Sequence, residues 1–215
     1  MFREWIVKNI KWFSQGCLRF DFGGKIIYTD PFDIESYVND ADYIFISHSH
    51  FDHFSLEDIQ KVIKKDTVFI FPKSMKKEAG NFSSYQVIYI LPGDCADLAG
   101  KIAFTAEYAY NINKTQCHPK ENEWVGYMFE YDGKRFYYTS DTELIPEMND
   151  VKADVIFLPL GQTYTMDSVE DAVKAVEVTG AKIAVPIHYG KYEGTVEDAE
   201  KFKTLLDGKA EVIIL

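Results

Sequence analysis

The chain has 215 residues, 47% of them hydrophobic, and a formal net charge of −11. This length fits one large domain or two small ones, and the acidic balance argues against binding to a nucleic-acid backbone, which needs a basic face. No stretch approaches the roughly 20 apolar residues of a membrane span. The N-terminal residues lack the features of a signal peptide, and three separated cysteines form no disulfide framework. We therefore expect a cytoplasmic protein.

The first third of the chain is predicted to be rich in β-strands, because β-forming residues dominate it. We expect strands at Trp5 to Phe13, Cys17 to Phe22, Lys25 to Thr29 and Tyr43 to Ser47. A turn at Gly23-Gly24 would join the second strand to the third. The run Ser55-Leu56-Glu57-Asp58 has the signature of a helix N-terminus and predicts a helix that ends near Lys65.

Beyond that helix more strands are predicted, and in the last third of the chain strands alternate with helices. Further strands are predicted at Thr67 to Phe71, Gln86 to Ile90, Ile102 to Ala106, Trp124 to Tyr131 and Arg135 to Thr139, with a short helix at Lys73 to Ala79 and a hairpin turn at Asp132-Gly133. The last third alternates strands at Val155 to Pro159, Lys182 to Ile187 and Glu211 to Leu215 with helices at Ser168 to Thr179 and Val196 to Leu206.

Antiparallel strands followed by alternating strands and helices predict an α+β protein. Two packed sheets with helices on their outer faces would satisfy both parts of the pattern. No repeat or flexible linker divides the chain, so we expect a single domain over 1–215. The terminal strand or an exposed sheet edge would allow a homo-oligomer.

Three histidines and an aspartate lie within six residues, in the run His48-Ser49-His50-Phe51-Asp52-His53. They directly follow the predicted strand that ends at Ser47. Histidine is the commonest metal ligand, and alternate side chains of an extended segment share one face. His48, His50 and Asp52 would begin on one side, and a turn would let His53 join Asp52 around a second ion. Four donors in six residues suit a pair of metals better than one.

Two other interpretations of this run are weaker. A solvated surface loop would explain a lone histidine, but it does not explain this spacing after an apolar strand. Ser47 and Ser49 could instead belong to a Ser-His-Asp hydrolase, but the run lacks the Gly-x-Ser-x-Gly turn that carries such a nucleophile.

Three further donors come later in the chain. Asp141 follows the predicted strand that ends at Thr139, and His188 follows the one that ends at Ile187. Asp141 would otherwise cap a helix over Glu143 to Met148, and His188 would otherwise be an ordinary strand-end histidine. The first cluster makes the ligand interpretation of both preferable. His118 lies in a loop beside Cys117, and a site rich in imidazole and carboxylate does not need the thiol.

These motifs resemble those of the metallo-β-lactamase-fold superfamily of metal-dependent hydrolases. Its pattern of His, any residue, His, any residue, Asp, His matches residues 48–53, and Ser140-Asp141-Thr142 and Pro186-Ile187-His188-Tyr189-Gly190 follow in the family's order. Three further segments resemble the UlaG-like lactonase branch of this superfamily. They are Tyr28-Thr29-Asp30-Pro31-Phe32, Leu158-Pro159-Leu160-Gly161 and Thr163-Tyr164-Thr165-Met166-Asp167. The resemblance covers residues from about 10 to 195.

The resemblance implies a four-layer αβ/βα sandwich, with two mixed β-sheets flanked by helices and a dinuclear metal site at one edge. His48, His50 and His118 would hold the first ion, Asp52, His53 and His188 the second, and Asp141 would bridge them. Many relatives have the third-motif histidine nearer a strand end, in a position here close to Tyr108-Ala109-Tyr110-Asn111, so His118 departs from the pattern. Zn²⁺ is the first expectation for both ions and Mn²⁺ the second.

The function expected is hydrolysis of a small ester or lactone by a metal-bridged hydroxide. Asp52 would bind the second metal, orient the hydroxide and pass a proton to the leaving group. Asp30 would hold a ligating imidazole by its other ring N–H, although it could be a simple Asp-Pro turn. Substrate-binding candidates near strand ends are Tyr110, Asn111, Tyr164 and Tyr189. The alternatives are a phosphodiesterase acting on a nucleotide or phospholipid-like substrate and, less favoured, a metal-binding module without turnover.

Overall fold

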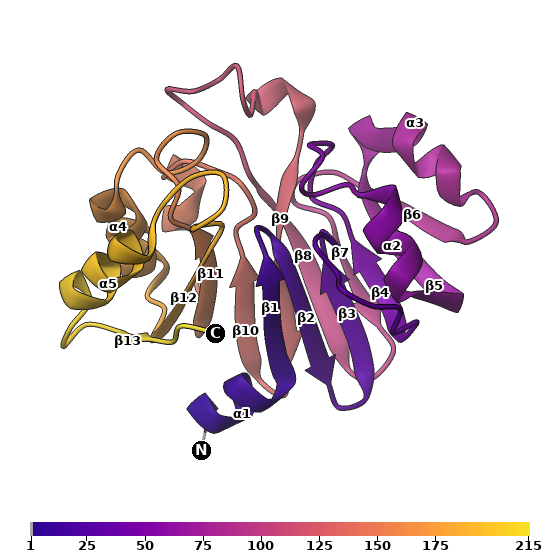
Figure 1. The fold of residues 1–215 in the computed structure, drawn as a ribbon, viewed down its shortest axis with the longest axis horizontal. Helices are drawn as coiled ribbons and strands as arrows, with labels where there is room; N and C mark the ends of the chain where they lie inside the picture. The colour runs from indigo at the N-terminus through magenta and orange to yellow at the C-terminus, as the bar shows by residue number, and fades with distance from the viewer. Residues whose placement is uncertain (1) are drawn as a thin grey trace. The chain divides into compact units, whose positions relative to one another are not determined.

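The computed structural model describes residues 2–215, and its contacts divide them into two compact units (Figure 1). One unit ends at Leu91 and also includes Leu215, and the other runs from Pro92 to Ile214. Each unit contains a mixed β-sheet with helices beside it. This confirms the predicted α+β class with two mixed sheets flanked by helices. Within residues 2–215 no helix has the length and apolar character needed to cross a membrane.

The first unit contains a six-stranded sheet with the strands in chain order. Its strands are β1 (Ile10–Ser14), β2 (Cys17–Phe22), β3 (Lys25–Thr29), β4 (Ala41–Phe45), β5 (Ile63–Pro72) and β6 (Gln86–Ile90). The strands β1 to β3 pair antiparallel, and β3 to β6 pair parallel. Parallel strands end at the same edge, so the segments after β3 and β4 start side by side.

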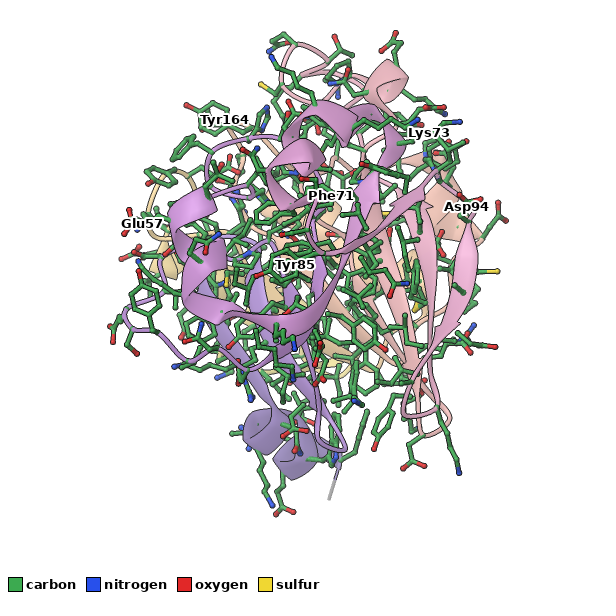
Figure 2. The ribbon with its side chains drawn as sticks, turned by 90° about the vertical axis from the view of Figure 1, so that its right-hand side faces the viewer. Glu57, Phe71, Lys73, Tyr85, Asp94 and Tyr164 are labelled. Atoms are coloured by element: carbon green, nitrogen blue, oxygen red, sulfur yellow. The ribbon has the colours of Figure 1, made fainter. Side chains whose placement is uncertain are left out.

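Helices cover the parallel part of this sheet. They are α2 (Leu56–Val62) and α3 (Lys76–Ala79), with 3-10 turns at Lys73–Met75 and Gly80–Phe82 (Figure 1). Ser55 caps α2 as predicted, because its side chain accepts a hydrogen bond from the Asp58 N–H. The rings of Phe69 and Phe82 stack 4.3 Å apart in the core between sheet and helices. Phe71 belongs to the same core, and Tyr85 packs against it (Figure 2).

The predicted strand from Trp5 to Phe13 is wrong at its start and confirmed over its last four residues. Residues Phe2–Asn9 form helix α1, and strand β1 begins only at Ile10. Ile6 is buried and the Trp5 ring stacks on Phe22, at 6.1 Å. The apolar residues at positions 2, 5 and 6 therefore follow helical spacing. Because these residue types also favour strands, the sequence pattern indicates a strand.

The second unit contains a seven-stranded sheet in the order β13-β12-β11-β10-β9-β8-β7. Its strands are β7 (Cys95–Leu98), β8 (Ile102–Tyr108), β9 (Val125–Tyr131), β10 (Lys134–Tyr138), β11 (Val155–Pro159), β12 (Ile183–Ile187) and β13 (Glu211–Val212). Pairing is antiparallel from β7 to β10 and parallel from β10 to β13. The edge strand β7 was not predicted, because three of its four residues are exposed and give no apolar pattern.

Two long helices lie beside β11 and β12 in this unit, α4 (Val169–Thr179) and α5 (Val196–Leu205) (Figure 1). Ser168 caps α4, and Thr195 forms a capping box with Asp198 at the start of α5. Two 3-10 turns, Lys120–Asn122 and Pro146–Asn149, complete the unit. The apolar faces of both helices pack with β11 and β12 in a core that includes Ile156 and Phe202. The parallel order leaves the loops after β10, β11 and β12 at one edge.

Candidate metal centre

The histidine run of the first unit forms a compact turn after β4. The backbone N–H groups of His53 and Phe54 both donate to the carbonyl oxygen of His50, which closes the turn. His48, Asp52 and His53 are buried, and His50 is half-buried. A turn that buries three of its four N/O donors is unlike a solvated surface loop.

Asp30 anchors this turn from the end of β3. Its backbone has φ of 41°, in the left-handed region that side chains other than glycine seldom adopt. Its carboxylate accepts hydrogen bonds from the Ser47 N–H at 2.7 Å, the Ser47 hydroxyl and the Nδ1–H of His53 at 2.8 Å. The expected hydrogen bond from Asp30 to an imidazole is therefore present, and its role toward a metal stays a prediction.

These hydrogen bonds decide which ring nitrogen each histidine can offer. The Ser47 hydroxyl donates to Asp30, so at 2.9 Å it accepts from the Nδ1–H of His48. His53 also carries its proton on Nδ1, facing Asp30. Both rings therefore present an unprotonated Nε2, which is the form that binds a metal.

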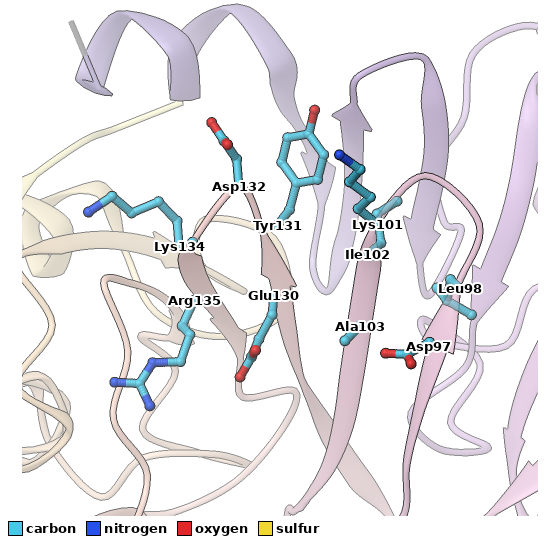
Figure 3. Close-up of a pocket in the computed structure, with 11 residues that line it drawn as sticks. Asp97, Leu98, Lys101, Ile102, Ala103, Glu130, Tyr131, Asp132, Lys134 and Arg135 are labelled. Carbon is cyan, nitrogen blue, oxygen red and sulfur yellow. The ribbon is translucent and has the colours of Figure 1, made fainter.

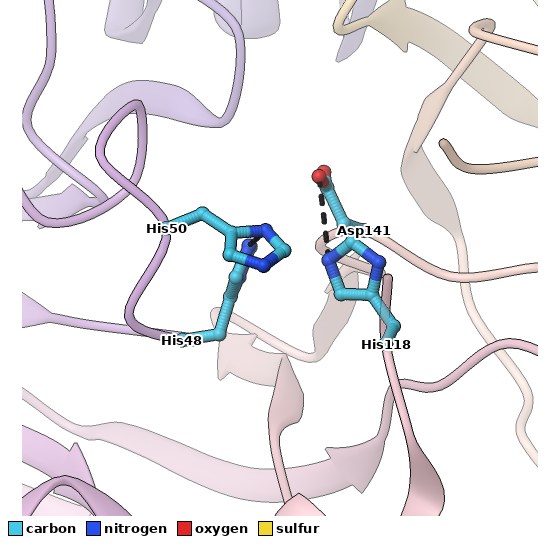
Figure 4. Close-up of side chains that lie close together, drawn as sticks. All are labelled: His48, His50, His118 and Asp141. Atoms are coloured by element: carbon cyan, nitrogen blue, oxygen red, sulfur yellow. Dashed lines mark hydrogen bonds and ion pairs between the residues drawn. The ribbon is translucent and has the colours of Figure 1, made fainter. Parts of the chain in front are cut away.

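The spacing between donors also suits a metal ion. His48 Nε2 lies 3.1 Å from His50 Nδ1 (Figure 4), close to the roughly 3.3 Å between two nitrogens on one tetrahedral zinc ion. His53 Nε2 lies 3.9 Å from Asp52 Oδ2. The same Asp52 oxygen accepts a hydrogen bond from the amide of the buried Gln15 at 3.3 Å. Gln15 was not among the residues that the sequence singled out.

In the second unit, three candidate ligands come from three separate loops, and two of them, both histidines, meet at one carboxylate oxygen of the third. Asp141 follows β10, and His188 follows β12. His118 Nε2 lies 3.6 Å from Asp141 Oδ2 (Figure 4), and His188 Nε2 lies 3.2 Å from the same oxygen. All three residues are buried. His118 therefore reaches Asp141 despite its late position in the loop.

Backbone strain occurs at His188 and at Ser140, the residue before Asp141. Ser140 has φ of 57° and His188 has φ of 54°, values that cost free energy for residues other than glycine. The alternative role of Asp141 as a helix cap is wrong, because the nearest helical turn, Pro146–Asn149, has Ile145 as its N-terminal cap.

Two buried glutamates organise the loops around these donors, and sequence reasoning missed both. Glu143 accepts hydrogen bonds from the backbone N–H groups of residues 112, 113 and 114. Glu193 accepts from the N–H groups of Thr163 and Tyr164 and faces Nδ1 of His188 at 3.1 Å. The only available signal was that each follows a proposed ligand closely, two residues after Asp141 and five after His188.

The four substrate-binding candidates differ in where they lie. Tyr110 is buried in the core and its hydroxyl donates to Glu147 at 2.9 Å, so burial disfavours a substrate contact. Asn111 is buried and its amide donates to the carbonyl oxygen of Tyr164 at 2.7 Å. Tyr164 is 46% exposed (Figure 2), and Tyr189 is half-buried. Of the four, Tyr164 is the side chain most available to a ligand.

A hollow of about 600 Å³ lies elsewhere in the second unit (Figure 3). Residues of β7 to β10 and their connecting turns line it, among them Lys101, Glu130 and Arg135. None of its lining residues is a histidine, and neither Asp141 nor the loops of Glu143 and Glu193 contribute to it. It therefore has no part in the metal chemistry.

Comparison with known proteins gives matches along most of the chain. The profile of a beta-lactamase superfamily domain matches residues 21–189. A UPF0173 metal-dependent hydrolase from Anoxybacillus flavithermus is 28% identical, over 95% of this chain and 96% of that protein. Among solved structures, a protein provisionally named a metal-dependent hydrolase from Parabacteroides distasonis has 32% identity and a TM-score of 0.82, covering 95% of this chain and 91% of that one.

A more distant structure shows the same fold. Igni18, described as a metallo hydrolase from Ignicoccus hospitalis, is 22% identical with a TM-score of 0.79, over 96% of this chain and 94% of that one. At this identity the likeness concerns the fold alone.

Proposed function

The chain belongs to the beta-lactamase superfamily, and from that premise we propose that it is a hydrolase of small esters or lactones that works with two divalent metal ions. The observation that carries the proposal is the ring orientation of His48, His53 and His188. Each has a hydrogen-bond acceptor at Nδ1, so each offers Nε2 to a metal. The fixed ring orientations and the membership of this superfamily both favour a catalytic role. They make a metal-binding module without turnover the weaker interpretation.

The proposed ligand sets are those of the family pattern. His48, His50 and His118 would hold one ion, Asp52, His53 and His188 the other, and Asp141 would serve both. Support comes from the donor chemistry, since mixed imidazole and carboxylate ligation suits Zn²⁺ first and Mn²⁺ second. The two histidines near one Asp141 oxygen in the second unit suit a carboxylate shared between ions. When bound, such ions polarise a carbonyl group and lower the pKa of water toward neutrality.

Asp52 is the proposed proton carrier. It would accept the proton of the attacking water on its carboxylate and return it to the leaving oxygen. The Gln15 amide, which donates to Oδ2, would keep that carboxylate in one orientation. Asp30 would act indirectly, by holding the imidazole of His53 and the hydroxyl of Ser47.

A neutral substrate is favoured over a phosphorylated one by the pairing of two lysines in the second unit. Lys114 is paired with Glu143 and Asp167, and Lys120 with Glu147. Their charges are therefore already balanced within the second unit. The exposed Tyr164 offers a ring face instead, which suits an apolar or aromatic substituent. This observation makes the phosphodiesterase alternative the weaker of the two.

The test is hydrolysis by zinc-loaded protein of two substrates side by side, a phenyl-substituted γ-lactone and bis(p-nitrophenyl) phosphate. We expect lactone opening with sustained turnover, slower phosphodiester cleavage, and loss of both on chelation. Sustained phosphodiester cleavage without lactone opening would favour the alternative. Zinc binding without turnover of either would favour the metal-binding module.

A further inference from the structure

The carboxylate of Glu193 connects a proposed metal ligand to a loop that carries a candidate substrate contact. It lies between β12 and α5, and its side chain is completely buried. Oε1 lies 3.1 Å from His188 Nδ1 and accepts from the Thr165 hydroxyl at 3.0 Å. Oε2 accepts from the backbone N–H groups of Thr163 and Tyr164, at 3.0 and 2.6 Å. Both oxygens are therefore used, each by a different segment.

The loop after β11 is shaped to admit this carboxylate. A Cβ atom built on Gly161 would lie 1.7 Å from Cδ of Glu193 and 2.0 Å from its Oε1. Non-bonded atoms do not approach so closely. Glycine at position 161 is therefore the residue that leaves room for the Glu193 side chain. The carbonyl oxygen of Gly161 lies 2.9 Å from the Thr165 hydroxyl, so the single proton of that hydroxyl is shared between Gly161 and Glu193.

We propose that Glu193 is a positioning residue, which keeps His188 in the Nδ1–H tautomer and links its orientation to the loop from residue 161 to 165. The inference rests on the proposed function only in taking His188 as a metal ligand. A carboxylate can only accept, so the ring must donate from Nδ1 and keep its lone pair on Nε2, the atom 3.2 Å from Asp141. The same carboxylate holds the backbone of Tyr164, so the metal ligand and the exposed ring share one anchor.

The substitution Glu193→Gln separates these two tasks with little change in shape. Its amide oxygen can still accept from Thr163 and Tyr164, so the loop keeps its hydrogen bonds. Its NH₂ group then faces His188 and favours the opposite tautomer, with the proton on Nε2. We expect zinc affinity to fall roughly 10- to 100-fold, while amide exchange at residues 163 and 164 stays slow.

The experiment measures Zn²⁺ affinity by competition with a chromophoric chelator, together with nitrogen-15 NMR of the histidine rings and hydrogen exchange of the loop amides. The matched control is Glu143→Gln, another buried carboxylate, which accepts from backbone N–H groups and pairs with Lys114. Its two oxygens accept from different N–H groups, Oε2 from residues 112 and 113 and Oε1 from residue 114. That control should therefore speed exchange only on the side that faces its new NH₂ group, and leave the His188 ring signals unchanged. If Glu193 only braces the loop, Glu193→Gln should leave the His188 ring signals and the zinc affinity as they are in the wild type.

The wild-type protein gives a test that needs no variant. In the zinc-loaded state His188 should show a slowly exchanging Nδ1 proton, and a rapidly exchanging one overturns the proposal. In Glu193→Gln, zinc affinity within about threefold of wild type with the Nδ1–H signal retained also overturns it. Neither measurement depends on substrate, so a wild-type protein that hydrolyses nothing would refute the proposed function and leave this inference standing.

Discussion

The two units supply the proposed metal ligands in opposite ways. In the first, four donors lie in one run of six residues, and a single carboxylate, Asp30, holds the turn by its backbone, its serine and one imidazole. In the second, the donors are separated by 23 and 47 residues of chain, as the positions 118, 141 and 188 show. Each loop there needs its own anchor, and Glu143 and Glu193 supply two of them.

The two units therefore differ in which residues position the candidate ligands. Donors that are close in sequence are positioned mainly by the end of one strand and the turn that follows it. Donors that are far apart depend on buried carboxylates, and these satisfy backbone N–H groups that burial would otherwise leave unpaired. The first unit should therefore be most sensitive to changes in its donors and Asp30, and the second to changes in its anchors.

The largest effect is expected for Asp52→Ala in the first unit. Loss of the proposed proton carrier and ligand should lower kcat by about 10²- to 10⁴-fold while the fold is retained. Steady-state lactone hydrolysis and circular dichroism measure the two quantities. Asp66→Ala, at an exposed position of β5, is the control and should match wild type. Unchanged turnover in Asp52→Ala would remove Asp52 from the mechanism.

Asp30→Ala should have the next largest effect, on stability. It removes the acceptor of three buried donors in the turn, so we expect the free energy of unfolding to fall by about 3 kcal/mol. Urea denaturation in the presence of chelator measures this without a contribution from metal. Near the end of β2 in the same unit, Asp21 accepts a hydrogen bond from the Gly24 N–H at an exposed position, and Asp21→Ala should cost less than about 1 kcal/mol. Equal losses would contradict the assigned role of Asp30.

Gly161→Ala tests the corresponding anchor in the second unit. The new methyl group overlaps the Glu193 carboxylate, so a loss of about 1–3 kcal/mol is expected from overpacking, with faster amide exchange at Thr163 and Tyr164. Gly80→Ala is the matched control, because a Cβ there meets nothing within 4 Å and its φ is −56°. That change should stabilise slightly. A neutral Gly161→Ala would show that the loop yields easily.

The smallest effect concerns the acid sensitivity of the first unit. Burial alone would raise the pKa of Asp58, but hydrogen bonds from Ser55, Lys61 and the Ile34 N–H outweigh it and hold the pKa below its usual range. A lowered pKa stabilises the fold at pH values above the unfolded-state pKa, and this stabilisation is lost as the pH falls through the folded-state pKa. Asp58→Asn should therefore lose less stability than wild type between neutral pH and about pH 2 in chelator-treated samples. Parallel curves would contradict this.

The comparison also explains what could be predicted from the sequence. The run from His48 to His53, the caps Ser55 and Ser168, and most strands were predictable because their signals are local. Helix α1 was missed because Trp5 and Ile6 are strand-forming residues at helical spacing, and β7 because an exposed edge strand has no apolar face. Glu193 was invisible for a different reason. Its role depends on the space that Gly161 leaves 32 residues earlier, and no local pattern records that pairing.

The most direct test of the account is the metal content of the protein after loading with zinc and removal of the excess, determined by elemental analysis beside the His118→Ala variant. Two zinc ions per chain in the wild type, falling to one in the variant, is the predicted result, because His118 would complete the first ion's ligand set. A wild type that holds at most one ion, or a variant that keeps two, would contradict the proposed dinuclear ligand sets.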